Sequence, residues 1–287
     1  MIIYSVISLG AIGAIGSVIL YVVSQKFKVD EDPRTAEVQE ALPGANCGGC
    51  GYPGCGSFAD ACVKASSLDG LLCPVGGNAT MTRVAAILGK EAVAGTPKIA
   101  VVKCNGTCEA RPRISVYNGA SNCAIASSLC GSETGCAFGC LGYGDCVRAC
   151  TFDAIRINPD TLIAEVSEEK CTSCGSCVKA CPKNIIELRK KGLKSRRIYV
   201  SCINRDKGGV ARKACANACI GCGKCLKECA FDAITIANNL AYIDDVKCRL
   251  CRKCSVACPT GAIHELNFPP RKEKEKEKET ATSTPNA

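Results

Sequence analysis

The sequence contains no tryptophan and a single histidine among 287 residues, and Phe, Trp and Tyr together make up 5% of the chain. Aromatic side chains contribute much of the buried area in the cores of globular domains. Their scarcity excludes a large aromatic-rich core. Something other than hydrophobic burial must hold these domains together.

Motifs for nucleotide binding and for nucleophilic catalysis are also missing. The sequence has no G-x-G-x-x-G after a predicted strand and no P-loop. The one histidine, His264, stands in AIHELN after the last run of cysteines. We interpret His264 as a surface or packing residue, so the sequence predicts no catalytic residue and no complete active site.

Cysteine, in contrast, occurs 27 times, nearly one residue in ten. Disulfide bridges need partners whose Cα atoms lie about 4.4–6.8 Å apart with converging Cβ vectors, which suits well-separated cysteines. Here the cysteines are bunched, their number is odd and no obvious cleavable signal is present. These features favour an intracellular metalloprotein over a secreted disulfide scaffold.

The first segment of the chain is apolar, since residues 2–23 carry no charge over 22 positions. A helix of about 20 residues spans the roughly 30 Å hydrocarbon layer, so we expect a transmembrane anchor at residues 1–25. The run lacks a basic segment before it and an A-x-A-like site at its end, which argues against a signal peptide. Lys26 and Lys28 follow it. The positive-inside rule then predicts a single-pass protein of the inner (cytoplasmic) membrane, with the rest of the chain on the cytoplasmic side.

Three further elements can be predicted before the main cysteine runs. A short helix begins after Asp32, with Pro33 at its first position. A second helix covers residues 78–92 and is capped by Asn78, and the β-branched run PKIAVVKC predicts a strand at residues 97–104.

An internal repeat organises the rest of the sequence. Four cysteine runs are each followed by a short apolar strand: TFDAIRI, PKNIIEL, AFDAITI and PTGAIHEL. The four units form two pairs, and a strand that ends in cysteine precedes each pair, in AVVKCNG and IYVSCIN. The repeat predicts a duplicated module at residues 97–190 and 197–267.

The modules are joined by the basic stretch RKKGLKSRR, residues 189–197. We interpret this stretch as a solvated linker, or alternatively as a docking surface for an acidic redox partner. We expect the second module to swing on it. The charged and polar residues 268–287 have nothing to bury and predict a disordered tail.

The spacing C-x2-C-x2-C-x3-C-P decides the kind of metal centre. Three thiolates on one tight turn can hold three irons of a cubane, whereas a tetrahedral zinc has no use for this crowding. In ferredoxins of the bacterial type the fourth cysteine of each run ligates the other cluster. Crossed ligation predicts four sets, which are Cys219, Cys222 and Cys225 with Cys258; Cys248, Cys251 and Cys254 with Cys229; Cys171, Cys174 and Cys177 with Cys150; and Cys136, Cys140 and Cys146 with Cys181.

The last of these sets is the least regular, because its cysteines are spaced x3, x5 and x3. Cys123 and Cys130 lie close enough in sequence to compete as ligands. A fifth set precedes the modules, in a small 4Fe–4S domain at residues 26–92, and consists of Cys47, Cys50, Cys55 and Cys73. The sequence therefore predicts about five 4Fe–4S clusters.

Seven cysteines remain outside the five sets: Cys62, Cys104, Cys108, Cys123, Cys130, Cys202 and Cys215. We interpret them as small buried hydrophobic residues, with Cys62 packed on a helix. The alternative is a further site that involves Cys104, Cys108, Cys123 and Cys130.

The formal net charge of +9 does not require a nucleic-acid partner. About twenty thiolates around five cores of about 2+ add roughly −10, so the protein with its clusters is close to neutral. We expect no nucleic-acid binding.

The motifs GANCGGCGYPGC and GCAFGCLGYGDCVRAC, behind an uncharged helix and before tandem ferredoxin modules, closely resemble the B subunit of Rnf complexes. The resemblance extends from the anchor to about residue 267. Two modules, where shorter family members carry one, and the extra Cys108 and Cys130 depart from the family pattern. The fold class expected is α+β, with an N-terminal transmembrane helix, a small 4Fe–4S domain and two tandem bacterial-type ferredoxin-like modules.

The resemblance implies a component of a membrane-bound ferredoxin:NAD oxidoreductase that couples electron flow to Na+ or H+ translocation. This chain would take low-potential electrons from soluble ferredoxin and pass them to membrane partners, while flavin and NAD chemistry belongs to other subunits. Two alternatives remain open. One is an iron–sulfur subunit of another membrane oxidoreductase, and the other is a structural zinc or nucleic-acid-binding module.

Overall fold

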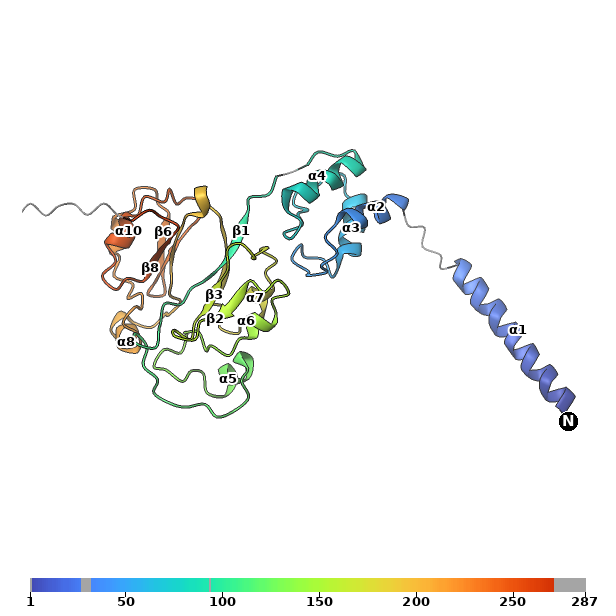
Figure 1. Cartoon of the computed structure of the whole chain (residues 1–287), viewed down its shortest axis with the longest axis horizontal. Helices are drawn as coiled ribbons and strands as arrows, with labels where there is room; N and C mark the ends of the chain where they lie inside the picture. The colour runs from blue at the N-terminus through green and yellow to red at the C-terminus, as the bar shows by residue number, and fades with distance from the viewer. Residues whose placement is uncertain (1, 27–31, 93, 271–287) are drawn as a thin grey trace, which may run out of the picture. The chain divides into compact units, whose positions relative to one another are not determined.

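The computed structural model describes residues 2–26, 32–92 and 94–270, and the chain divides into two compact units, residues 1–94 and 95–287 (Figure 1). The described part of the first unit is helical, and the second unit combines short helices with paired strands. This mixed content agrees with the α+β prediction. Most of the predicted tail, residues 271–287, lies outside the described residues.

The first helix, α1 (Ile2–Lys26), covers the uncharged segment. Within the described residues, no helix combines the length and the apolar character that crossing a membrane requires. The transmembrane prediction for residues 2–23 is therefore not confirmed.

Three short helices form the rest of the first unit: α2 (Pro33–Ala41), α3 (Cys55–Lys64) and α4 (Gly77–Leu88). The predicted start of α2 is confirmed, because the Asp32 side chain accepts the backbone N–H of Arg34. The predicted bounds of α4 are wrong. Gly76 rather than Asn78 is its N-cap, and Gly89, with a φ of +63°, ends it three residues before position 92.

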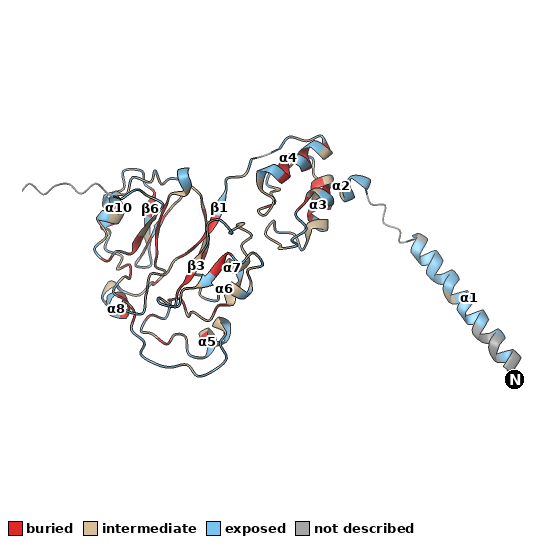
Figure 2. Cartoon of the chain, in the orientation of Figure 1, coloured by how far each residue is buried: buried red, intermediate tan, exposed pale blue. Residues whose placement is uncertain are grey.

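The core of the first unit lies where these helices meet (Figure 2). Val38 of α2, Phe58 of α3 and Val84 of α4 are almost fully buried. The ring of Tyr52, in the cysteine-rich loop, meets Phe58 edge to face with centroids 5.6 Å apart. This contact ties the loop to the helices.

The second unit contains the duplicated part of the chain. Its strands are β1 (Lys98–Val102), β2 (Ile155–Ile157), β3 (Ala164–Val166), β4 (Ile186–Lys190), β5 (Arg197–Val200), β6 (Ile234–Ala237), β7 (Leu240–Ile243) and β8 (Ile263–Leu266). Its helices are α5 (Cys123–Leu129), α6 (Asp145–Arg148), α7 (Ser176–Ala180), α8 (Gly208–Ala214), α9 (Lys224–Lys227) and α10 (Lys253–Val256), with a 3-10 turn η1 (Leu193–Ser195).

The strands pair in the same way in both halves of this unit. In the first half β1 pairs antiparallel with β4 and β2 with β3, and in the second half β5 pairs with β8 and β6 with β7. The strands predicted after the four cysteine runs are β2, β4, β6 and β8, and those predicted before each pair of runs are β1 and β5. The repeat in the sequence is thus a repeat in the structure.

Strand β1 is buried on both faces, which explains its uninterrupted apolar sequence. Successive side chains of a strand point to opposite faces. Ala100 and Val102 pack in the core of the first module, whereas Ile99 and Val101 form a second cluster with Tyr199 of β5. The outer faces of the first strands of the two modules therefore pack against each other.

The basic stretch between the modules is solvated in its middle, where Leu193 and Lys194 are exposed, but not at its two ends. Arg189 is 2% exposed and Arg197 is 4% exposed. Arg189 donates to the carbonyl oxygen of Ile243, and Arg197 donates to Glu168 of the first module. Both arginines are held by partners across the boundary between the modules, so the prediction of a swinging second module is wrong.

Candidate metal centres

The four cysteine runs of the second unit share one backbone feature, a left-handed residue at the start of a short helix. Each run enters a short helix through an N-cap residue in the left-handed region, and these residues are Gly144, Gly175, Gly223 and Arg252. This N-cap residue lies two residues before a cysteine in every case. It turns the chain sharply, and glycine accepts the positive φ without strain at three of the four positions.

The second module brings together the two crossed sets that the spacing predicts. Burial, with the charges of Cys219, Cys222 and Cys258, raises the pKa of the Cys225 thiol to about 11. All four of these cysteines line one cavity of about 340 Å³. Cys258, from the second run, thus lies with three cysteines of the first.

The reciprocal set lies around Cys254. Burial raises the pKa of this thiol to about 12, and the charges of Cys248, Cys251, Cys225 and Cys229 act in the same direction. Cys225 belongs to the neighbouring set, so the two sets are adjacent. The backbone N–H of Leu250 donates to the sulfur of Cys248 at 3.5 Å.

One set of the first module follows the same rule. Burial, with the charges of Cys171, Cys174 and Cys150, raises the pKa of Cys177 to about 11. The four cysteines line a cavity of about 350 Å³. Thr172 also lines this cavity, and its buried Oγ1 has no hydrogen-bond partner among the described residues.

The other set of the first module differs from the prediction in one member. Cys146 lies near Cys140, Cys181 and Cys123, whose charges, with burial, raise its pKa to about 12. Cys136, which the spacing placed in this set, instead accepts a hydrogen bond from Asn204 Nδ2 at 3.6 Å. The structure therefore brings together three of the four predicted residues.

The left-handed N-cap residues explain why this run departs from the regular cysteine spacing. When the four runs are aligned on these residues, Cys140 occupies the position of Cys171, and Tyr143 occupies that of Cys174. The hydroxyl of Tyr143 donates to Glu133 at 3.0 Å, and burial together with this hydrogen bond raises its pKa to about 12. The second cysteine of this run is replaced by a neutral phenol.

Cys123 reaches the same region through the start of α5. Its backbone N–H donates to Asp145 Oδ1 at 2.9 Å, and the next N–H, of Ala124, donates to Oδ2 of the same carboxylate at 3.0 Å. Asp145 opens α6 and directly precedes Cys146 in the chain. The carboxylate therefore fixes the start of α5 beside this set.

The first unit brings Cys50, Cys55 and Cys73 together. Burial raises the pKa of Cys73, as do the charges of Cys50 and Cys55, and the N–H of Gly76 donates to its sulfur at 3.3 Å. Asn46 holds the loop, because its Oδ1 accepts the N–H of Cys55 at 2.8 Å. Cys47 lies in the same loop and is partly buried.

Six of the cysteines outside the predicted sets fall into three groups. Cys62 lies in α3, is fully buried and packs in the core, as expected. Cys108 and Cys130 are exposed, so the buried-hydrophobe interpretation is wrong for these two. Cys104, Cys202 and Cys215 line one cavity together with Cys136.

The cysteine sets fit a cluster better than they fit a single ion. A tetrahedral zinc with bonds of about 2.3 Å would draw its sulfurs to about 3.8 Å of one another. Among the described residues, no three Cys, His, Asp or Glu side chains could hold a single metal ion. Each set offers thiols, the ligands of cluster iron, and two of the sets line cavities of about 340 and 350 Å³.

The raised pKa values of the thiols in these sets also favour a cluster. Several buried thiols that face one another stay protonated, because ionising them together in a low dielectric is unfavourable. A cationic iron core compensates four thiolates and releases their protons on binding. The unpartnered hydroxyl of Thr172 supplies a donor that such a core could use.

Three family models match the chain in these regions. A model described as "Putative Fe-S cluster" matches residues 42–70, which include Cys47, Cys50 and Cys55. Models described as "4Fe-4S dicluster domain" match residues 134–185 and 218–262, and residues 169–233. Both modules are therefore of the 4Fe–4S ferredoxin type.

Similarity to whole proteins decides the family. The chain is 49% identical, over 89% of its length and 75% of the relative's, to the B subunit of the Na(+)-translocating ferredoxin:NAD(+) oxidoreductase complex of Acetobacterium woodii. This chain belongs to the B-subunit family of Rnf complexes. The B subunits of Methanosarcina acetivorans and Clostridium ljungdahlii are 38% and 37% identical to it, over 92% and 88% of this chain and 98% and 88% of their own lengths.

Membership in the Rnf B family settles two alternatives from the sequence. The chain is an iron–sulfur electron-transfer subunit of the Rnf type. It is therefore neither a subunit of another membrane oxidoreductase nor a structural zinc or nucleic-acid-binding module. The resemblance inferred from the cysteine motifs is confirmed.

Proposed function

We propose that this chain relays low-potential electrons from soluble ferredoxin through about five 4Fe–4S clusters to the other subunits of an Rnf-type complex. The adjacency of the cysteine sets carries this proposal. Cys146 of one set lies near Cys177 of the next, and Cys225 lies near Cys254. Clusters held by neighbouring sets would be close enough to exchange electrons.

A 4Fe–4S cluster supplies one-electron chemistry, and its protein shell sets the potential through burial and hydrogen bonds. The residues of this chain provide that shell. The backbone N–H groups of Gly76, Ala154 and Leu250 donate to the sulfurs of Cys73, Cys150 and Cys248. Each N–H···S bond stabilises negative charge on the sulfur and would raise the potential of the cluster.

The second module offers a place for the donor to dock. Cys251 is exposed, and Arg249 and Lys253 on either side of it are exposed as well. The side chain of Arg252 is already engaged within the module, because it forms an ion pair with Glu265 at 2.5 Å and lies over the ring of Phe268. An acidic ferredoxin would be attracted to the two exposed cations beside an accessible cluster ligand.

Charge reversal tests this docking surface. We expect Arg249→Glu with Lys253→Glu to slow reduction of the anaerobic full-length chain by reduced ferredoxin about tenfold at low ionic strength. The matched control, Lys207→Glu with Lys213→Glu, alters two exposed lysines in or beside α8 and should reduce at the unaltered rate. Equal slowing by both pairs would place docking elsewhere.

Failure of ferredoxin to reduce the unaltered chain, under conditions in which dithionite bleaches its absorbance, would reject ferredoxin as the donor.

We also propose that α1 anchors the chain to the cytoplasmic membrane, with the cluster-bearing units on the cytoplasmic side. Two features support this. Residues 2–23 are uncharged, and large apolar side chains of α1, including Leu20 at 71% and Tyr21 at 66%, are exposed and are not covered by the described part of the chain.

Extraction of membranes with alkaline carbonate tests the anchor. The full-length chain should remain in the pellet, and a chain that lacks residues 2–23 should appear in the supernatant when other subunits are absent. Release of both chains would exclude an anchor, whereas protease digestion of sealed inverted vesicles reports the side on which the cluster units lie.

Ion translocation and NAD chemistry belong, on this proposal, to other subunits with flavin and membrane domains. The relatives' names include both Na(+) and proton translocation, and this chain would supply electrons to either kind of complex. Its removal from the complex should abolish ferredoxin-dependent NAD reduction but leave the flavin content of the other subunits intact.

A further inference from the structure

Four cysteines outside the sets described above meet at the boundary between the two modules. Cys104, Cys136, Cys202 and Cys215 line one cavity of about 320 Å³. This volume is close to the 340 and 350 Å³ of the two cavities that are lined by cysteine sets of ferredoxin spacing. The cavity lies wholly within the second compact unit.

The four residues occupy equivalent positions in the internal repeat. Cys104 and Cys202 each stand two residues after the first strand of their module, which ends at Val102 in one case and Val200 in the other. Cys136 and Cys215 each stand four residues before the first cysteine of a run, Cys140 and Cys219. Each module therefore contributes the same pair of thiols to one cavity.

The thiols interact with one another. Burial raises the pKa of Cys215, and the charges of Cys104 and Cys136 act in the same direction. Burial also raises the pKa of Cys202 to about 12, with contributions from the charges of Cys219 and Cys136. Cys136 therefore lies near both Cys202 and Cys215, and Cys104 lies near Cys215, in the cavity that all four line.

The wall of the cavity carries donors that suit an anionic group. Asn204 is 1% exposed, and its Nδ2 donates to the sulfur of Cys136 while its backbone N–H donates to that of Cys202. The backbone N–H of Cys140 donates to the sulfur of Cys104 at 3.5 Å. These N–H···S bonds resemble those at the other sets.

A buried arginine is the second independent sign of a ligand. Arg111 is 7% exposed and lines the cavity. Its Nη2 donates to the carbonyl oxygen of Cys140 at 2.8 Å, but its buried Nε and Nη1 have no hydrogen-bond partner among the described residues. A buried cation with two unpaired donors is unfavourable unless a negative group meets it.

We propose that Cys104, Cys136, Cys202 and Cys215 bind a sixth 4Fe–4S cluster, and that Cys123 replaces Cys136 in the set with Cys140, Cys146 and Cys181. A cubane held by four thiolates is anionic and would compensate Arg111. The assignment rests on the proposed function only in that the chain carries 4Fe–4S clusters.

The proposed sixth site lies between the cysteine sets of the two modules. Cys104 lies beside Cys140 of the first module, and Cys202 lies beside Cys219 of the second. A cluster here would join the two pairs of clusters into one continuous path, in which each transfer moves one electron between neighbouring clusters and breaks no bond.

The test compares metal content in anaerobically purified full-length chains. With six clusters we expect about 24 irons and about 24 sulfides in the unaltered chain. The variant Cys202→Ala with Cys215→Ala should lose about four of each, whereas the control Cys108→Ala with Cys130→Ala, which alters two exposed cysteines, should lose none. About 20 irons in both the unaltered chain and the first variant would overturn the sixth site.

Zinc in place of four irons would overturn it as well. A chain without iron and sulfide would instead reject the proposed function as a whole. Anomalous diffraction at the iron edge from crystals of the unaltered chain keeps the site testable if the variant does not fold. The proposal predicts iron density between Cys136 and Cys202, and density at five sites with none there contradicts it.

Discussion

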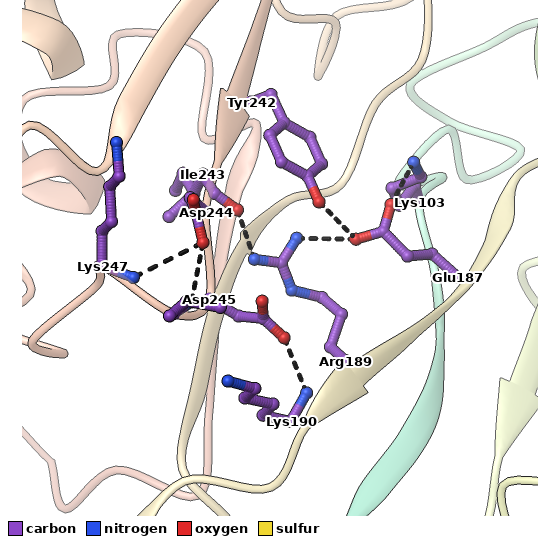
Figure 3. A network of polar contacts seen from close by, with 10 residues as sticks. Lys103, Glu187, Arg189, Lys190, Tyr242, Ile243, Asp244, Asp245 and Lys247 are labelled. Atoms are coloured by element: carbon purple, nitrogen blue, oxygen red, sulfur yellow. Dashed lines mark hydrogen bonds and ion pairs between the residues drawn. The ribbon is translucent and has the colours of Figure 1, made fainter. Parts of the chain in front are cut away.

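The guanidinium of Arg189, in β4 of the first module, donates a hydrogen bond to the carbonyl oxygen of Ile243, in β7 of the second (Figure 3). The same side chain donates to Glu187 at 2.9 Å and lies over the ring of Tyr242, 5.5 Å from its centroid. Tyr242 in turn donates to Glu187 at 3.2 Å, and Asp245 accepts the backbone N–H of Lys190 at 2.8 Å. This network joins the two modules at the point where the chain passes between them.

Replacing Arg189 by methionine should destabilise the second unit by about 3 kcal/mol, because Glu187 and the Ile243 carbonyl would lose a buried charged donor. The midpoint of anaerobic denaturation in urea measures the loss. Arg156→Met is the matched control, since the side chain of Arg156 is 79% exposed and its ion pair with Glu165 spans 3.4 Å. We expect less than about 0.5 kcal/mol for the control. Similar values for both variants would mean that the modules are not held together by this network.

Gly221, between Cys219 and Cys222, should tolerate no side chain. It has a φ of +62°, and a Cβ atom would lie 2.7 Å from the carbonyl oxygen of Asn239. Gly261 has a φ of +65°, but a Cβ there would meet nothing within 4 Å in the described part of the chain. Gly261→Ala should cost about 1 kcal/mol from backbone strain alone.

Gly221→Ala should cost about 3 kcal/mol, since it adds a clash with backbone to the same strain. It should also lower the iron content, because the loop that carries Cys219 and Cys222 must shift. Urea denaturation and iron analysis measure the two effects. Full iron content in Gly221→Ala would show that the loop moves without disturbing its site.

Stability should fall as the pH drops below about 6.5, the ordinary pKa of histidine. Burial lowers the pKa of His264, which pairs with Tyr199 across β8 and β5. The unfolded chain therefore binds a proton at a pH where the folded chain does not, and unfolding becomes easier as the pH falls through the unfolded value toward the folded one. At a pH above both pKa values, the histidine is neutral in the folded and the unfolded chain, and stability does not depend on its protonation.

Urea midpoints at pH 7.5 and pH 6 measure this dependence. His264→Gln should remove most of the difference between the two conditions. An equal pH dependence in the variant would assign it to another group.

Cys73 and Cys62 should differ in what their removal changes. The family model that matches residues 42–70 contains Cys62 but not Cys73. Cys73 lies with Cys50 and Cys55 and accepts an N–H from Gly76, while Cys62 is fully buried in the core of the helices. Cys73→Ala should therefore lower the iron content by about four.

Cys62→Ala should leave the iron content unchanged and cost about 1–2 kcal/mol of stability, since it removes one buried sulfur. Iron analysis and urea denaturation of both variants distinguish the roles. Iron loss from Cys62→Ala with none from Cys73→Ala would exchange the two assignments.

Much of the fold followed from local patterns in the sequence. The β-branched segments after the cysteine runs became strands, and the repeat of these segments became a repeat of paired strands. The x2, x2 and x3 spacing also predicted which cysteines of Cys171–Cys181, Cys219–Cys229 and Cys248–Cys258 come together, because the turn geometry within each run is local and the crossing is a property of the repeated unit.

The contacts between modules could not be read in the same way. Charged residues such as Arg189 and Arg197 predict a solvated segment by composition, and their burial depends on partners from Ile243 and Glu168, far away in sequence. Spacing alone groups Cys136 with Cys140, Cys146 and Cys181, whereas in the structure its sulfur accepts a hydrogen bond from Asn204 of the second module. Alignment on the glycine two residues before Cys146, Cys177 and Cys225 puts Tyr143, and not a cysteine, at the position of Cys174.

The central claim is that this chain is a multi-cluster electron carrier, and one spectrum tests it most directly. The anaerobically purified full-length chain should be analysed for iron, zinc and acid-labile sulfide and then reduced with dithionite for low-temperature EPR. The account predicts iron and sulfide in equal amounts, at four of each per cluster, and a broad spectrum from magnetically coupled neighbouring clusters. Zinc in place of iron, or iron without sulfide and without a reduced-cluster signal, would contradict it.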